Sequence, residues 1–464
     1  MSQRKWTPLY VVVLLFTIVL APLIISGYSN INKAKSSQAA GDYAAAASTY
    51  ARAAQTLFWR GDLWEQAGIS AALAGDYSAA IVYLGKQTPR TEDGWVWLAT
   101  AQLQTGDVQS AYTSCASGLQ AFDSARLYRL LAFVQRSQKN WDAERSALQN
   151  QVRLDANEAY AHYRLGVLLM LSWPENARSE LKAASALDPE VDSAVQTLDA
   201  ALALSSIQPD TSQQKLILGR ALGLVQEWEL AEVAFTQAVG MDENNAEAWA
   251  WLGEAKQQLG QDGSVELDQA LRLDHTSANV RALRGLYWNR LNRYEQALAE
   301  YLLAAEFEPE NPRWWVSIGE AQANLGDLTA ALEAYQHAVK LAPSEAEYWR
   351  LLAAFCAERS AYVEEIGLPA AQHAQTLLPN DPAVLDTLGF AYLASGRYAN
   401  AEQNLKKSLE ISPEYFPAHL HLALTYLAQG ERSAAFNSLV YVRDADSSGV
   451  YAEAARQLLE RYFP

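Results

Sequence analysis

Prolines recur at a nearly constant interval in the second half of the chain. Pro309, Pro343, Pro379 and Pro413 are 34, 36 and 34 residues apart, and each follows a helical pattern with small residues at fixed positions. Glycines recur upstream at intervals of similar length: Gly219, Gly253, Gly285, Gly319 and Gly389. A period of about 34 residues that contains two helices is typical of a repeat array in which each unit packs only against its neighbours. The spacing therefore predicts an all-α solenoid.

The unit at 312–345 gives a mechanical reason for each fixed residue type. Gly319 and Ala331 are small, so two antiparallel helices can approach closely there. Gly326 can adopt the positive φ that ends the first helix, and a proline stops the second helix. Tyr335 can fill the space between one repeat and the next, and Trp315 occupies an aromatic position in the first helix. This pattern resembles the tetratricopeptide repeat.

Tracing the period along the chain predicts about twelve units. The clearest are 212–245, 246–277, 278–311, 312–345, 346–381, 382–415 and 416–449, and weaker ones lie near 26–59, 60–93, 92–125, 124–157 and 158–190. The unit at 246 is two residues short around Gly263, and the unit at 346 carries a two-residue insertion near Tyr362, so we expect tight or bulged turns there. The resemblance implies a right-handed superhelical α-solenoid of tetratricopeptide-type helix-turn-helix repeats. The residue patterns at the two ends of the chain add an expected N-terminal transmembrane helix and a C-terminal capping helix.

Breaks in the pattern predict the domain organisation. An extra helical stretch, Val191–Leu204, leads into a polar segment at 205–212 that contains a proline, which favours a joint between two repeat blocks. The last segment, Val450 to Tyr462, has an apolar helical face suited to covering the final repeat. The predicted domains are an N-terminal tail and anchor at 1–28, a degenerate block at 29–190, a joint at 191–211, a second block at 212–449 and a capping helix at 450–464.

The N-terminal segment favours a membrane anchor. No charged residue occurs from Trp6 to Asn32, and Pro8 to Ile25 is an almost unbroken apolar run. Eighteen residues rise about 27 Å as a helix, close to the thickness of a bilayer core. Arg4 and Lys5 precede the run, which indicates a cytoplasmic tail and repeats on the extracytoplasmic side.

A cleaved signal peptide is the alternative. Its apolar region would be Val11–Ala21, with Ser26 or Gly27 before the cut, but an Ala-x-Ala site is missing. Lys33 and Lys35 follow the run and roughly balance the basic residues before it, which weakens the predicted orientation of an anchor in the membrane. Both interpretations place the repeats outside the cytoplasm.

Composition and motifs exclude several classes of function. The net charge of −17 disfavours nucleic acid as a partner, because phosphate binding needs a basic surface. Cys115 and Cys356 lie in distant repeats at helix-core positions, and the six histidines are scattered, so neither a disulfide framework nor a metal site is expected. Phosphate-loop, dinucleotide-binding, nucleophile-elbow and zinc-protease motifs are absent from the sequence. We therefore expect a protein that is not an enzyme and has no cofactor.

The remaining candidate is a surface. The resemblance implies that the second, fifth, ninth, twelfth and thirteenth positions of each unit line a peptide-binding groove. The candidate residues are Arg220, Glu254, Gln257, Asn289, Arg290, Glu320, Asn324, Arg350, Asp386, Phe390 and Leu424. We expect the polar ones to contact an extended peptide and to add little to folding. At its far end the groove turns apolar through Phe390, Leu393, Leu420, Leu424 and Leu427, unless the capping helix covers these side chains.

Three functions fit these features. The first is a membrane-anchored scaffold that binds proteins or peptides and serves the assembly or organisation of a cell-envelope complex. The resemblance supports it, since several bacterial proteins with one N-terminal anchor and such repeats act in cytochrome maturation, lipopolysaccharide assembly or secretion. The others are a subunit associated with a glycosyltransferase or a polysaccharide or lipopolysaccharide assembly system, and a secreted soluble binding protein.

Overall fold

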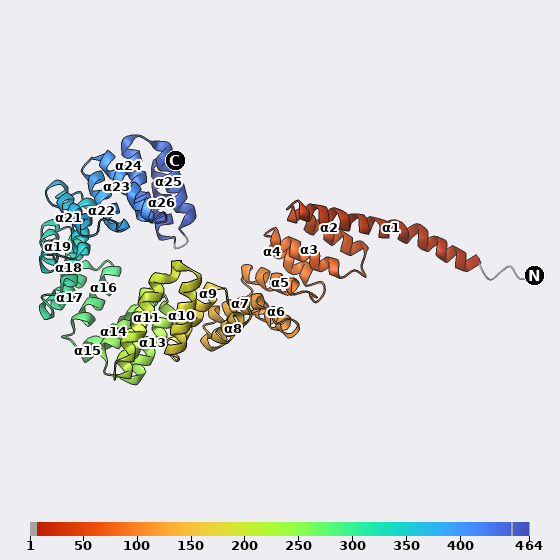
Figure 1. Ribbon diagram of the computed structural model, residues 1–464, viewed down its shortest axis with the longest axis horizontal. Helices are drawn as coiled ribbons and strands as arrows, with labels where there is room; N and C mark the ends of the chain where they lie inside the picture. Colours follow the sequence, from red (N-terminus) through yellow and green to blue (C-terminus); the bar gives the residue numbers. More distant parts are fainter. Residues whose placement is uncertain (1–6, 447–448, 464) are drawn as a thin grey trace, which may run out of the picture. The chain divides into compact units, whose positions relative to one another are not determined.

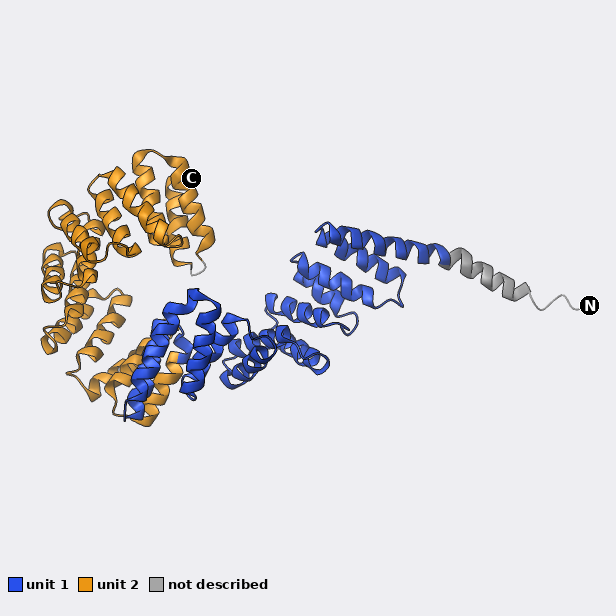
Figure 2. Ribbon diagram, viewed as in Figure 1, with its two compact units in different colours: residues 1–230 blue, residues 231–464 orange. Residues whose placement is uncertain are grey.

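The computed structural model describes the backbone of residues 7–446 and 449–463, and the side chains of 21–446 and 449–463. All regular structure within these ranges is helical, with 26 α-helices and no strand (Figure 1). The chain divides into two compact units, residues 1–230 and residues 231–464 (Figure 2). Each unit is described by itself below.

Unit 1 consists of helices that follow one another in antiparallel pairs. Their bounds are α1 Thr7–Ala39, α2 Tyr43–Thr56, α3 Asp62–Leu73, α4 Tyr77–Leu84, α5 Glu92–Gln104, α6 Val108–Ala121, α7 Ala125–Ser137, α8 Trp141–Leu154, α9 Ala159–Leu169, α10 Pro174–Leu187, the 3-10 helix η1 Pro189–Val191, α11 Asp192–Ser206 and α12 Thr211–Leu224. Helix α13, Trp228–Met241, begins in unit 1 and ends in unit 2.

Unit 2 continues the same alternation. Its helices are α14 Ala246–Gln258, α15 Ser264–Leu273, α16 Ala278–Arg290, α17 Tyr294–Phe307, α18 Pro312–Leu325, α19 Leu328–Leu341, α20 Ala346–Glu358, the π-helix η2 Val363–Gly367, α21 Leu368–Leu377, α22 Pro382–Ala394, α23 Tyr398–Ile411, α24 Phe416–Gln429, α25 Arg432–Ala445 and α26 Val450–Tyr462. Apart from α11, α12, α13 and α26, the 26 helices of the described residues form eleven successive packed pairs, which confirms the predicted helix-turn-helix repeats. The handedness of the superhelix stays a prediction.

A Gly-Asp pair forms the turn inside several repeats. Gly326 has a φ of 88°, which closes the first helix, α18, in the left-handed conformation predicted from the sequence. Asp327 then caps α19, because its carboxylate accepts a hydrogen bond from the backbone N–H of Ala330 at 3.0 Å. The same turn recurs at Gly41-Asp42, Gly75-Asp76 and Gly106-Asp107. Two adjacent residues thus end one helix and start the next.

A side-chain hydrogen bond ties the start of many repeats to the end of the preceding one. The fourth residue of the first helix contacts the backbone carbonyl six residues upstream, as Trp315 does by donating from Nε1 to the oxygen of Pro309 at 3.1 Å. The same contact is made by His162, Gln214, Trp249, Arg281, Trp349 and His419. In α22 the fourth residue is Leu385, whose side chain has no donor.

Small residues allow the close packing inside a repeat. An added Cβ at Gly319 would lie 2.9 Å from the ring of Tyr335, so a larger residue would force the two helices apart. Tyr335 in turn stacks on Phe355 of the next repeat, with ring centroids 5.0 Å apart. Ala331 is fully buried in the same cluster. The predicted roles of these positions are confirmed.

The two length variations are absorbed locally, as expected. In the short unit, an added Cβ at Gly263 would collide with the backbone of Gly253, so α14 and the turn before α15 touch directly. In the long unit, the insertion forms η2, and Tyr362 precedes it with a φ of 55°. The repeat resumes after both sites.

Extra helices lie at the predicted joint and at the end of the chain. Helix α11 occupies the stretch at 191–211 and packs against α10 and α12. Helix α26 packs against α25, where Leu458, Leu459 and Phe463 join a cluster with Leu439 and Val442. The capping helix is therefore confirmed, while the division into domains stays a prediction.

Helix α1 runs without interruption from Thr7 to Ala39, and its second half packs on α2. No helix in the part of the chain whose side chains are described is long and apolar enough to cross a membrane. The predicted anchor lies largely outside those side chains, because Pro8 to Leu20 are not among them.

Candidate functional site: the first-helix surface

The first helices of successive repeats pack side by side and form a continuous surface in each unit, here called the first-helix surface. In unit 1 the neighbours are α3, α5 and α7, and in unit 2 they include α18, α20, α22 and α24. The repeat period places the same helix positions on this surface in every unit. The predicted groove residues from Glu254 to Leu424 belong to the first helices of unit 2.

Several predicted groove residues in unit 2 bind each other across repeats. Arg290 donates two hydrogen bonds to Glu254, at 2.7 and 2.6 Å, and so joins α16 to α14. The Glu254 side chain is only 5% exposed, and Gln258 also donates to it at 2.8 Å. We expected Arg290 to add little to folding, but its position opposite a buried carboxylate gives it a structural role.

Further pairs repeat this arrangement along the same surface. Asn289 contacts Glu320 at 3.4 Å, and Arg359 donates to Asn324 at 2.5 Å. Arg350 pairs within its own helix with Glu347 at 2.7 Å, and this hydrogen bond raises the pKa of the Arg350 guanidinium. Most of the polar groups predicted for a peptide therefore already have intramolecular partners.

The apolar end of the predicted groove is partly covered. Phe390 stacks on His421 with ring centroids 4.1 Å apart, and His421 contacts the buried Asp386 at 2.8 Å. Leu420 packs in the cluster that contains Leu458 and Leu459 of the capping helix. Leu393 and Leu427 pack around Leu422 and Tyr426, while Leu424 is partly exposed. The capping helix therefore covers Leu420, as one of the two alternatives predicted. The other leucines at this end of the groove pack within the repeats or stay partly exposed.

The two remaining predicted residues are Gln257 and Arg220. Gln257 donates to the carbonyl of Gln261 in its own turn at 3.2 Å. Arg220 lies on α12 in unit 1, whereas the other predicted groove residues belong to unit 2.

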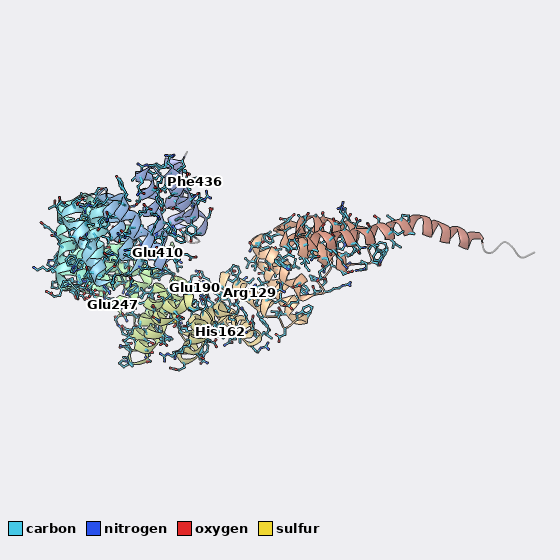
Figure 3. All side chains as sticks on the ribbon, turned by 45° about the horizontal axis from the view of Figure 1, so that its top comes forward. Arg129, His162, Glu190, Glu247, Glu410 and Phe436 are labelled. Atoms are coloured by element: carbon cyan, nitrogen blue, oxygen red, sulfur yellow. The ribbon has the colours of Figure 1, made fainter. Side chains whose placement is uncertain are left out.

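A cavity of about 370 Å³ opens on the first-helix surface of unit 1. Helices α5, α7 and α9 form its walls, and α8 contributes to its lining. Its apolar side includes Leu103, Leu130 and Phe133, and the Phe133 ring is mostly exposed. At its rim lies Arg129, which Figure 3 labels and which has no ion-pair partner among the side chains that the structure describes.

The polar side of the cavity is built on one buried arginine. Arg164 donates to both oxygens of Glu144, at 2.7 and 3.0 Å, and to Glu227 at 2.7 Å. Burial alone would lower the pKa of Arg164, but its hydrogen bonds to Glu144 and the negative charge of Glu227 raise it. Arg136 extends the network by donating to the hydroxyl of Tyr160 at 2.8 Å.

One polar atom in the lining is left without a protein partner. Gln151 donates from Nε2 to Glu158 at 2.9 Å, while its Oε1 is buried without a hydrogen bond to any described residue. This oxygen is itself shielded from solvent, so it is not open to a ligand in the cavity. The cavity therefore offers an apolar wall and the exposed guanidinium of Arg129.

Sequence reasoning missed this cavity because the groove positions were assigned only in the clearer repeats. The ninth, twelfth and thirteenth positions of the weaker unit at 92–125 are Thr100, Leu103 and Gln104, and all three line the cavity. In the unit at 124–157 the same positions include Ala132 and Arg136, which line it as well. Assigning the groove positions in the two weaker repeats as well would therefore have located these cavity residues.

The two cysteines are buried, as predicted. Neither thiol forms a disulfide, and burial raises the pKa of both Cys115 and Cys356 to about 12. Among the described residues, no group of His, Cys, Asp and Glu side chains could hold a metal ion.

Comparisons with known proteins agree with the repeat pattern. Residues 290–346 and 316–382 match one family model described as a tetratricopeptide repeat, and residues 392–438 match a second model of that description. Residues 290–382 and 392–438 therefore contain tetratricopeptide repeats, as the sequence predicted.

The similar proteins are much longer than this chain or differ widely in sequence. Tetratricopeptide repeat protein 37 of Xenopus laevis is 26% identical over 225 residues, which cover 46% of this chain and 13% of that protein. Protein O-mannosyl-transferase TMTC1 of Homo sapiens is 26% identical over 177 residues, which cover 37% of this chain and 20% of that protein. A solved structure, the APC/C hetero-tetramer Cut9-Hcn1, is 16% identical with a TM-score of 0.45 and covers 93% of this chain and 95% of that chain.

Proposed function

We propose that this protein is a membrane-anchored, non-catalytic tetratricopeptide-repeat scaffold that binds proteins or peptides on its first-helix surface. Its role would be the assembly or organisation of a cell-envelope complex, with the repeats on the extracytoplasmic side. The observation that carries the proposal is the cavity of unit 1, because it combines an apolar wall with the exposed guanidinium of Arg129, which has no ion-pair partner among the described side chains.

The chemistry of the cavity favours an extended peptide. An apolar side chain of the ligand would cover Phe133 and Leu130, which are otherwise in contact with water. A ligand carboxylate would pair with the exposed guanidinium of Arg129. In unit 2, the predicted residues Glu320, Asn324 and Arg350 would contribute contacts beside their intramolecular pairs.

Site-specific photo-crosslinking tests where a partner binds. A photoreactive amino acid would replace Phe133 on α7 or, as the control, Tyr112 on the second helix α6, which is also exposed. We expect crosslinked partners from position 133 and not from position 112. Equal crosslinking from both positions, or none from 133, would contradict binding at the cavity.

A double substitution then measures the contribution of the cavity. Arg129→Glu with Phe133→Ser removes the free cation and the apolar wall, while leaving Arg164 and its partners in place. Loss of one charge-assisted contact worth about 1.5–3 kcal/mol corresponds to a decrease in affinity of about tenfold or more. Unchanged capture of partners by a normally folded double variant would refute the proposed site.

The anchor is tested separately by fractionation. The apolar run from Pro8 to Ile25 supports it, since α1 is helical throughout that stretch. We expect the full chain to stay in the membrane after an alkaline wash and to keep its own N-terminus. A soluble protein that begins near Tyr28 would instead indicate a secreted binding protein.

Association with a transferase or with polysaccharide assembly is a second candidate. One similar protein bears the name of an O-mannosyl-transferase, although the match covers a fifth of it. Crosslinked partners that include a membrane transferase would favour this version of the scaffold function.

A further inference from the structure

Two neighbouring aromatic side chains are exposed in the turn between α2 and α3. Phe58 is 74% exposed and Trp59 is 49% exposed. Their rings meet edge to face with centroids 5.1 Å apart, so they form one apolar projection. Large aromatic side chains grouped in this way on a surface usually mark a site of contact.

This turn lies beside the end of the apolar run of α1. Leu57 fills the space at Gly27, where an added Cβ would lie 2.5 Å from the leucine side chain. Arg60 lies near the same part of α1, since Asp62 and, to a smaller extent, Tyr28 raise the pKa of its guanidinium. The two aromatic rings therefore lie at the level of α1 at which the uncharged run Trp6–Asn32 approaches its first lysine.

The described part of α1 at this level is also apolar and exposed. Ile25 is 69% exposed, and Leu23 and Tyr28 are about half exposed. These side chains lie at one level of α1 but on more than one face of the helix, and together with Phe58 and Trp59 they make up what we call the juxtamembrane patch. Helix α1 is continuous from Thr7 to Ala39, so no flexible linker separates the apolar run from the first repeat.

We propose that the juxtamembrane patch inserts into the interfacial layer of the lipid bilayer and holds the first repeat against the membrane. The inference rests on the proposed anchor, whose last apolar residues are continuous with the patch. Tryptophan and tyrosine are enriched at the headgroup level because one part of the side chain is apolar and another is polar. The patch places such residues on two different elements, α1 and the turn after α2.

The charges around the patch are compatible with lipid headgroups. Arg60 forms an ion pair with Asp62 at 2.6 Å, so the nearest acidic group is neutralised. Lys86 and Arg90 are exposed in the turn between α4 and α5, which also touches this end of the repeat, because Gln87 fills the space at Gly61. Basic side chains at this depth can contact lipid phosphates.

Fluorescent labelling of the full chain tests the proposal. The native thiols are buried, so a maleimide dye that responds to its environment would attach selectively at Phe58→Cys. The control is Ile207→Cys, at a similarly exposed apolar residue after α11. Both proteins are reconstituted in phosphatidylcholine vesicles with or without lipids that carry a nitroxide in the headgroup region. We expect a blue shift and nitroxide-dependent loss of emission for the label at position 58 only.

The outcomes separate the patch from the anchor. If the protein floats with the vesicles but the two labels are quenched equally little, the anchor stands and the patch proposal is wrong. If the label at 58 is shielded from both nitroxide and aqueous iodide, another protein surface covers the patch, and the lipid proposal is overturned. If the full chain does not float with vesicles, the anchor itself fails, and the patch proposal fails with it.

Discussion

Replacing Arg164 by Met should leave the buried carboxylate of Glu144 in unit 1 without its cationic partner. The Arg164 and Glu144 side chains are each 2% exposed, and they share two hydrogen bonds of 2.7 and 3.0 Å. Removing one member of a buried ion pair typically costs about 3–5 kcal/mol, because the other charge is left without a partner or water. Glu144 lies in the first turn of α8, whose dipole favours a negative charge, so we expect the lower part of that range. Glu227, the second partner of Arg164, would still have a cation nearby in this variant, because Arg136 lies 3.6 Å from its carboxylate.

The double variant Arg164→Met with Glu144→Met supplies the control. Replacing both charges by apolar side chains is often neutral or stabilising, so most of the lost stability should return. Hydrogen exchange of α8 and α9 is the suitable assay, since a repeat array need not unfold in one step. A double variant as unprotected as the single one would refute this account.

Three further results are expected. Arg290→Ala should raise hydrogen exchange in α14 and α16 by an amount that corresponds to about 1.5–3 kcal/mol, since it deprives the buried Glu254 of its cation, and normal protection there would count against the pairing. Gly319→Leu should cost about 1–3 kcal/mol through overpacking, with faster exchange confined to residues 278–381, whereas uniform loss along the chain would contradict nearest-neighbour packing. Cys115 and Cys356 should resist alkylation at pH 8 until denaturant is added, because a thiol with a pKa of about 12 is almost wholly protonated, and rapid labelling of the native protein would show that they are accessible.

The sequence predicted the fold well because each repeat is specified by local chemistry. The positive φ of Gly326 follows from residue type and helix period, and the predicted capping helix has the bounds observed for α26. The pairing of Arg290 with Glu254 was not predicted, because the two residues are 36 positions apart and a long side chain has many accessible rotamers. Which polar groups stay free for a ligand depends on such pairings, so the candidate site was harder to predict than the fold.

The backbone conformation of an insertion is also hard to predict from sequence. The extra residues near Tyr362 were located from the period, but their conformation as a π-helix after a left-handed residue depends on tertiary packing. In unit 1, the cavity residues follow the period, yet the depth of the cavity depends on how Arg164 draws α8 and α9 together.

The side-chain bond between successive repeats also bears on how the array responds to force. Where Trp315, Trp349 or His419 bonds the carbonyl six residues upstream, pulling the repeats apart must break a directional hydrogen bond within a short displacement. At the start of α22, the buried side chain of Leu385 makes apolar contact instead, whose attraction weakens gradually with separation. The start of α22 therefore lacks the short-range resistance to extension that the side-chain hydrogen bond gives to α18, α20 and α24.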